Sequence, residues 1–169
     1  MNTKNKNLKI AIAGLGFGKK VHLEALKESL YLTPVAIYHY EKAQKSILEK
    51  ETGLEFFHDW EDLVKSPEID GIIIATPPES RFKLAKQALE NNKNLLLEKP
   101  VSISSSEIEE LQRISLINNL SVCVDFEYRA VPLFLQTKKL IDENILGDIY
   151  LVKLDWLMGS RSDPKRSWN

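Results

Sequence analysis

The chain has 169 residues, which is enough for one ordinary domain with a sizeable core and a short segment beyond it. Hydrophobic residues make up 43% and charged residues 28%, a balance that excludes a disordered or fibrous protein. The 23 lysines and arginines nearly cancel the 24 aspartates and glutamates, so no nucleic-acid partner is expected.

The N-terminal residues 1–9 are polar and cationic, and the apolar run that follows at 10–13 ends at Gly14. A secretory signal or a membrane span requires a much longer apolar segment. We therefore expect no signal peptide, no membrane span and no membrane partner, and a cytoplasmic location.

Short apolar runs recur along the chain and predict the strands of a sheet. Each run is too short for a helix and too continuously apolar for a strand with one solvent-facing side, so we expect strands buried on both faces. A weaker run at 55–58 predicts an edge strand. The buried strands are expected at residues 10–13, 35–37, 72–75, 95–97 and 122–126.

Amphipathic helices are predicted between these runs. Apolar residues recur at helical spacing at Phe82, Ala85 and Leu89, and again at Ile108, Leu111 and Ile114. Thr76, followed by two prolines and Glu79, indicates an N-cap with a capping box, and Ser106 with Glu109 repeats that signal. The alternation of strands and helices predicts an α/β fold with a parallel, doubly wound sheet.

The pattern changes after Phe126. A long helix is predicted at about 131–143, it ends near Gly147, and one alternating strand is predicted at about 149–156. We therefore expect a first domain over residues 1–126. Residues 127–169 are expected to form a crossover helix and the first strand of an incomplete second domain.

The single cysteine, Cys123, lies between two valines and is predicted to be a small core residue of a buried strand. No intramolecular disulfide can form. The three histidines, His22, His39 and His58, are too far apart for the spacing of a metal-ligand pair, so no metal site is expected.

Residues 10–18, with the sequence IAIAGLGFG, predict a strand that runs into a glycine-rich turn and then a helix, as in a Rossmann-type dinucleotide-binding domain. Gly14 permits the tight turn, and Gly16 lets the backbone approach a pyrophosphate. The helix N-terminus then offers free N–H groups to the phosphates. We assign the turn to cofactor binding, with the residues Gly14, Leu15, Gly16, Phe17 and Gly18.

The third position of the dinucleotide motif holds Lys19 instead of a small residue, and Gly18 lies one place earlier. Because this position usually serves close packing of the helix on the strand, the packing is left open, whereas the phosphate contact is not. Two alternatives also stay open. The turn could be structural in some other α/β protein, or it could belong to a methyltransferase, which uses a similar loop.

The residues after the second strand bear on the choice of cofactor. NAD enzymes commonly place Asp or Glu there to bind the ribose 2′-OH, but this chain has Tyr38, His39 and Tyr40 before Glu41. A neutral or cationic side chain does not repel a 2′-phosphate. We therefore expect NADP to be tolerated at least as well as NAD, with His39 in the cofactor site. The alternative is that His39 only caps the strand and Glu41 begins a helix.

Glu98, Lys99 and Pro100 directly follow the apolar run at 95–97. Ligands of open α/β sheets bind at the carboxyl ends of the strands. A proline drives the residue before it into an extended conformation, so Lys99 is expected to project from the strand tip. A lysine there could donate a proton to, or orient, a carbonyl or hydroxyl group. The structural alternative is a solvated lysine at a strand end.

Three segments carry a family resemblance: GLGFGKKVHL at 14–23, ATPPESRFKLAKQALENNKNLLLEKPVS at 75–102 and FEYRAVPLF at 126–134. They resemble the Gfo/Idh/MocA oxidoreductases, a family that includes glucose–fructose oxidoreductase and inositol dehydrogenase. The resemblance runs from about Lys9 to the end of the chain. It implies an NAD(P)-binding Rossmann domain followed by the start of a truncated α+β substrate domain.

The resemblance also implies roles for particular residues. In the family, the glycine loop holds the cofactor phosphates, and the segment that matches Thr76 and Pro77 lies beside the cofactor. The Glu and Lys of the E-K-P element lie near the nicotinamide, which implies cofactor contact for Glu98 and Lys99 and catalysis by Lys99. Arg129 matches an arginine of the crossover segment, where substrate contact and a structural salt bridge are both open.

This sequence departs from the family pattern at three points. The acid after the second strand is absent, and Arg81 stands where the family usually has a histidine. The Asp and His that complete the family's catalytic group belong to the substrate domain, beyond Asn169. The chain alone is therefore expected to lack a complete active site.

The implied activity is hydride transfer between a nicotinamide cofactor and a small-molecule substrate, namely a sugar, a cyclitol or a related alcohol or carbonyl compound. The alternative is a non-catalytic dinucleotide-binding module, such as a truncated product, a sensor or part of a split protein. Homo-oligomers are expected only for a full-length form.

Overall fold

A computed structural model describes residues 7–155 and residue 157 of the chain. The chain divides into two compact units, Met1–Phe126 and Glu127–Asn169, and each is described by itself. None of the helices in the described residues is both long and apolar enough to cross a membrane.

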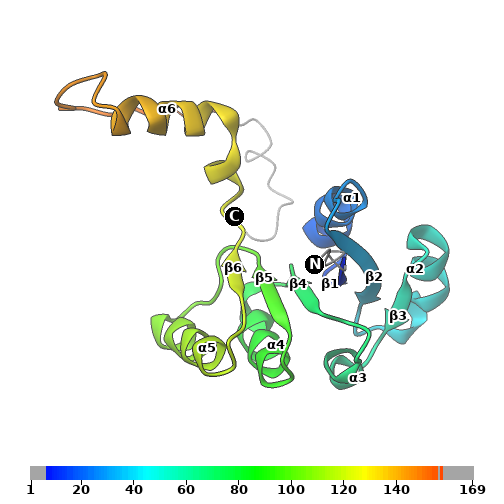
Figure 1. Cartoon of the computed structure of the whole chain (residues 1–169). Coiled ribbons are helices and arrows are strands. Elements are labelled where there is room, and N and C mark those ends of the chain that lie inside the picture. The colour runs from blue at the N-terminus through cyan, green and yellow to red at the C-terminus, as the bar shows by residue number, and fades with distance from the viewer. Residues whose placement is uncertain (1–6, 156, 158–169) are drawn as a thin grey trace, which may run out of the picture. The chain divides into compact units, whose positions relative to one another are not determined.

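The first unit contains a sheet of six parallel strands in the order β3-β2-β1-β4-β5-β6 (Figure 1). The order reverses between β1 and β4, which makes this pair the topological switch point of a doubly wound sheet. The Rossmann-type fold expected from the strand–helix alternation is therefore confirmed, including the edge strand β3. The strands are β1 (Leu8–Ala13), β2 (Leu32–Tyr38), β3 (Glu55–Phe57), β4 (Gly71–Ile74), β5 (Asn94–Leu97) and β6 (Val122–Val124).

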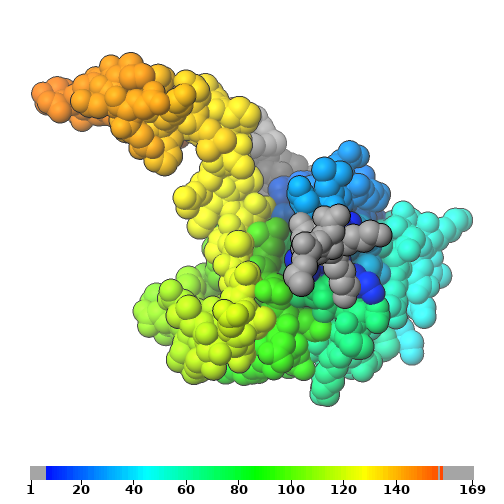
Figure 2. All heavy atoms as spheres, viewed as in Figure 1, coloured from blue at the N-terminus to red at the C-terminus, as the bar shows by residue number. Residues whose placement is uncertain are grey.

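Helices cover both faces of the sheet. The largest core cluster joins one face to α3 (Trp60–Lys65), α4 (Pro78–Glu90) and α5 (Ser105–Ile117). On the other face, two smaller clusters involve α1 (Leu23–Lys27) and α2 (Lys45–Thr52). The space-filling view shows α2 in cyan and α5 in yellow-green at opposite ends of this unit (Figure 2).

The central strands explain why the sequence reads as continuous apolar runs. In β1, Ala11 and Ala13 belong to the core beneath α3, α4 and α5, whereas Ile10 and Ile12 belong to the cluster beneath α1. Successive side chains of a strand point to opposite faces, so a strand covered on both faces is apolar at every position. The four residues of β4 are all buried for the same reason.

The prediction for Cys123 is wrong, because its side chain is exposed. It lies in the edge strand β6, where Val122 packs against the core beneath α5 and Cys123 points to the opposite face. On that opposite face, the clusters beneath α1 and α2 include residues of β1 to β5 and none of β6.

The two predicted capping boxes are also wrong. Helix α4 begins at Pro78 with the extended Pro77 as its N-cap, and the Thr76 hydroxyl has no hydrogen-bond partner among the described residues. Two consecutive prolines hold the chain extended until Pro78, so Thr76 lies one residue too early to cap. Helix α5 has Ser104 as its N-cap, without a side-chain capping bond.

The second unit contains one short helical turn and one helix in its described part, η3 (Glu127–Ala130) and α6 (Pro132–Asp142). Helix α6 confirms the helix expected at 131–143. The strand expected at 149–156 does not form over 149–155, and Trp156 lies outside the described residues. A strand needs a neighbouring strand to pair its N–H and C=O groups, and the described part of this unit supplies none.

Lys93 is a buried cation that connects the turn between α4 and β5 to the loop before β4. Only 7% of its surface is exposed, and its Nζ donates to the carbonyl oxygens of Ser66 at 2.6 Å and Ile69 at 2.7 Å. We expect Lys93→Met to lower the free energy of unfolding by about 1–3 kcal/mol, because two carbonyl groups lose a charged donor. Urea unfolding measures this loss. The exposed Lys83→Met on α4 is the control and should change it by less than about 0.5 kcal/mol.

The difference in unfolding free energy between the parent and Lys93→Met is also expected to depend on pH. Burial lowers the pKa of Lys93 below its ordinary value of 10.5, and the Asp70 carboxylate opposes that shift. Between the folded and unfolded pKa values the unfolded state binds more protons, so this group adds stability as the pH rises toward 10.5. The stability advantage of the parent over Lys93→Met should therefore grow in that range. An advantage that shrinks there would contradict this account.

Candidate functional site

The carboxyl ends of three neighbouring strands, β1, β4 and β5, meet at one edge of the sheet. Ala75 N–H donates to Ala13 O at 2.8 Å, and Glu98 N–H donates to Ile74 O at 3.0 Å. These bonds extend the strand pairing beyond β1, β4 and β5. They bring the glycine turn, the segment after β4 and the Glu98–Lys99 segment to a single edge, where open α/β sheets bind ligands.

Gly14 begins the turn after β1 with φ +116°, a conformation that residues with a side chain rarely adopt. A Cβ atom at this position would lie 2.5 Å from the carbonyl oxygen of Ala75 and 2.7 Å from its carbon. The turn can therefore approach the end of β4 only with glycine at this position.

Gly16 has open space where a Cβ atom would lie, with no atom of the described residues within 4 Å. No hydrogen bond within the described part of the chain engages the N–H groups of Leu15 and Gly16. The Leu15 side chain packs against the core cluster of β2, β3 and α2, whereas Phe17 is exposed. The backbone of the turn thus offers free donors beside an open space, which fits the pyrophosphate of a dinucleotide.

Gly18, not residue 19, provides the close packing of the helix on the strand. A Cβ atom on Gly18 would lie 3.1 Å from Ile12 Cγ2 and 3.2 Å from Ala75 Cβ, so Gly18 supplies the close helix–strand contact. The helix begins with a π-helical turn, η1 (Gly18–His22), in which Lys19 N–H donates to Gly14 O at 3.1 Å. This wider turn accommodates a motif in which the third glycine lies one residue early.

His39 follows β2, which runs beside β1 at the same edge. Its N–H donates to Phe57 O at 3.1 Å, and its Nδ1 accepts from Glu41 N–H at 3.3 Å. The His39 and Tyr40 rings lie 4.6 Å apart between centroids. These contacts fix the backbone after β2, and the assignment of His39 to the cofactor site stays a prediction.

Glu98 and Lys99 differ sharply in exposure. Glu98 is 6% exposed, whereas Lys99 is exposed and lies outside any helix at the tip of β5. Lys99 N–H donates to Glu98 Oε2 at 3.2 Å. The same edge holds Thr76, whose hydroxyl is buried, and the exposed Pro77. The geometry places a cationic side chain at the surface of the edge and a carboxylate beneath it.

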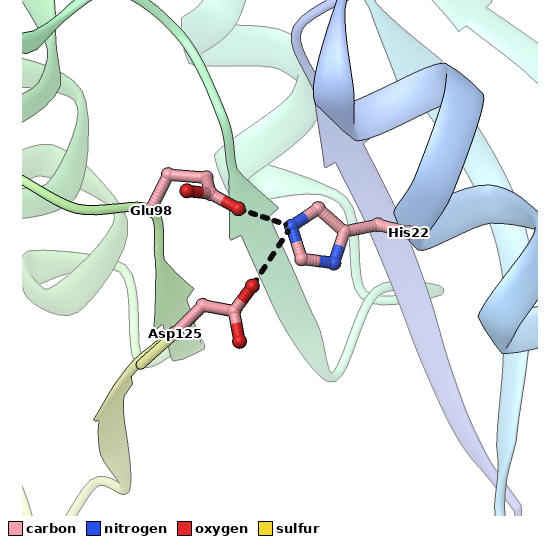
Figure 3. Close-up of side chains that lie close together, drawn as sticks. All are labelled: His22, Glu98 and Asp125. Carbon is pink, nitrogen blue, oxygen red and sulfur yellow. Dashed lines mark hydrogen bonds and ion pairs between the residues drawn. The ribbon is translucent and has the colours of Figure 1, made fainter. Parts of the chain in front are cut away.

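His22, for which the sequence predicted no metal site, lies beneath this edge with Glu98 and Asp125 (Figure 3). Its Nε2 lies 2.8 Å from Glu98 Oε1 and 3.7 Å from Asp125 Oδ2. A buried carboxylate requires such a partner. One signal in the sequence could have indicated this cluster: Asp125 follows β6 as Glu98 follows β5, so both acids lie at the same edge of the sheet.

The three side chains of His22, Glu98 and Asp125 also form the kind of set that can hold a metal ion. One ligand atom from each lies within 4.8 Å of the others. In this structure His22 Nε2 and Glu98 Oε1 contact each other directly.

Arg81 is the second residue whose place the sequence did not reveal. It lies in the first turns of α4, it is 4% exposed, and its guanidinium donates to the carbonyl oxygens of Thr76, Glu98 and Pro100. Burial lowers the pKa of Arg81, while the Glu98 and Glu79 carboxylates raise it. The signal in the sequence that could have indicated a special role for this position is that Arg81 replaces the histidine usual in the family.

Arg129 is exposed in the second unit, within η3. No hydrogen bond or ion pair of its side chain occurs among the described residues. Substrate contact and a structural salt bridge both remain predictions for it.

The sequence that forms this sheet and its glycine turn matches the model of a known protein family. The family model described as an oxidoreductase family with an NAD-binding Rossmann fold, Gfo/Idh/MocA, matches residues 8–126. The chain belongs to the Gfo/Idh/MocA oxidoreductase family. The resemblance drawn from the glycine turn and the E-K-P element is thus confirmed.

Similar proteins include two oxidoreductases and one solved dehydrogenase structure. An uncharacterized oxidoreductase of Synechocystis sp. is 38% identical over 99% of this chain and 45% of its own length. Glucose-6-phosphate 3-dehydrogenase of Bacillus subtilis is 28% identical over 94% of this chain and 45% of its own length. The crystal structure of scyllo-inositol dehydrogenase from Lactobacillus casei, with bound NAD(H) and scyllo-inositol, is 28% identical with a TM-score of 0.78. It matches 85% of this chain and 43% of its own chain. The chain thus spans about half the length of these relatives.

Proposed function

We propose that this chain is the nucleotide-binding part of an NAD(P)-dependent oxidoreductase that acts on a sugar, a cyclitol or a related alcohol or carbonyl compound. One observation carries the proposal: the open backbone of the glycine turn and the exposed Lys99 lie at the same edge of the sheet. Relatives named as dehydrogenases of inositol, levoglucosan and glucose-6-phosphate support a polyhydroxylated ring as the substrate class.

The residues at this edge would have separate roles in binding the cofactor and in proton transfer. The N–H groups of Leu15 and Gly16 would bind the pyrophosphate, since no acceptor among the described residues competes for them. When bound, the nicotinamide cofactor supplies or accepts the hydride. Lys99 would hold or release a proton at the substrate oxygen through its Nζ. Glu98, fixed by His22, would support the backbone of Lys99 from below.

Gly16→Val tests the cofactor site. The Val side chain would enter the open space above the turn, so we expect the Kd for NADH to rise by about 100-fold, which corresponds to two lost charge-assisted hydrogen bonds. Fluorescence titration with NADH and NADPH measures the change. The unfolding midpoint should stay unaltered because no atom of residues 7–155 lies within 4 Å of the new Cβ. Equal affinities of parent and variant would show that the turn does not bind the cofactor.

His39→Asp tests the choice of cofactor. Residues 38–40 include no acid, so we expect the parent to bind NADPH at least as well as NADH. The new carboxylate should accept from the ribose 2′-OH and repel a 2′-phosphate, which shifts the ratio of the two Kd values toward NADH. Tyr40→Asn, at the neighbouring exposed position, is the control for a change of shape without charge. A parent that strongly prefers NADH would refute the expectation.

A further inference from the structure

Arg81 is a buried arginine, 4% exposed, whose side chain donates to main-chain groups. Its guanidinium is directed at three main-chain carbonyl oxygens, those of Thr76, Glu98 and Pro100. A buried charge is costly unless its donors are satisfied, and here two of the three guanidinium nitrogens are bonded, while Nε has no partner in the described part of the chain.

The three carbonyl groups belong to two segments, the one that follows β4 and the one that follows β5. Thr76 follows β4 and adjoins Ala75, the residue that the glycine turn contacts most closely. Glu98 and Pro100 flank Lys99 on both sides. One side chain therefore connects the backbone around Lys99 to the backbone beside the glycine turn.

We propose that Arg81 is a positioning residue for the nicotinamide side of the cofactor site. It acts through the backbone, by holding the segment 98–100 against Thr76, and it touches neither cofactor nor substrate. The inference rests on the proposed function, because it needs a dinucleotide at this edge. The side chain of Glu98 is held separately by His22, so the two contacts restrain different atoms of the same residue.

The shape of the guanidinium matters to this role. Its planar fork presents several N–H groups in fixed directions, so that Nη1 reaches the carbonyl oxygens of Glu98 and Pro100 while Nη2 reaches that of Thr76. Lysine carries the same charge on a single nitrogen and cannot span both segments in the same way. Methionine fills similar volume and removes every donor. The pair Arg81→Lys and Arg81→Met therefore separates charge and volume from the bridging geometry.

The test compares two ligands that differ only on the nicotinamide side. NADH and ADP-ribose share the adenosine and the pyrophosphate, and only NADH carries the nicotinamide ring. Isothermal titration calorimetry of the 169-residue chain measures both Kd values. We expect Arg81→Met to weaken NADH binding by about tenfold and to leave ADP-ribose binding within about twofold. Arg81→Lys should lie between parent and Arg81→Met, and the exposed Arg113→Met should match the parent.

The outcomes separate the inference from the proposed function. A parent that binds neither ligand overturns the proposed function and this inference with it. If the parent binds both ligands, an unchanged ratio of the two Kd values in Arg81→Met overturns the inference alone, and so does an equal loss of both. Should Arg81→Met fail to fold, Arg81→Lys decides by the same ratio, because an unchanged ratio there contradicts a bridging role.

Discussion

Lys99→Ala is expected to lower turnover by a factor of about 10²–10⁴ in a form of the protein that carries a substrate domain, the usual contribution of a general acid–base group. The exposed side chain at the tip of β5 can reach a substrate without any change in the core. The Kd for NADH and the melting temperature should change little. Steady-state kinetics with a polyol substrate, together with NADH titration, measures these quantities.

The control for this prediction is Lys83→Ala, which removes another exposed lysine from α4. Its turnover should equal that of the parent. If Lys99→Ala loses folding and activity in equal measure, Lys99 has only a structural role at the strand end. A variant with full turnover would remove Lys99 from the reaction altogether.

Gly14→Ala is expected to destabilise the first unit by about 2–6 kcal/mol, the sum of a strained backbone and an overpacked contact. The φ of +116° is unfavourable for alanine, and the new Cβ would lie 2.5 Å from Ala75 O. Because Ala75 N–H is bonded to Ala13 O, relief of the contact requires β1 and β4 to separate. Urea unfolding followed by circular dichroism measures the loss.

Gly53→Ala provides the matched control. Gly53 also has a positive φ, +71°, but a Cβ atom there would meet no atom within 4 Å in the part of the chain that the structure describes. This substitution should cost only the backbone strain, about 1–2 kcal/mol. If Gly14→Ala and Gly53→Ala lower the free energy of unfolding equally, the close contact with Ala75 does not contribute to the cost of Gly14→Ala.

The sequence by itself determined the order of strands and helices and the place of the glycine turn. Strands such as β4 are covered on both faces, so each of their positions must be apolar, and this requirement can be read from consecutive residues. Gly14 could be predicted because a tight turn after a strand needs a conformation that only glycine adopts readily. Both requirements are local along the chain.

Only the tertiary structure decided which polar groups lie beneath the site. His22 and Glu98 are 76 residues apart in the chain, and Arg81 reaches two different segments, so no local pattern could pair them. The exposure of Cys123 depends on which faces the helices cover, and the strand expected at 149–156 depends on a partner strand. Whether a side chain is buried within a helix or strand can be read from local periodicity. A hydrogen bond between distant residues or a strand pairing requires a second segment, and only the fold sets the position of that segment.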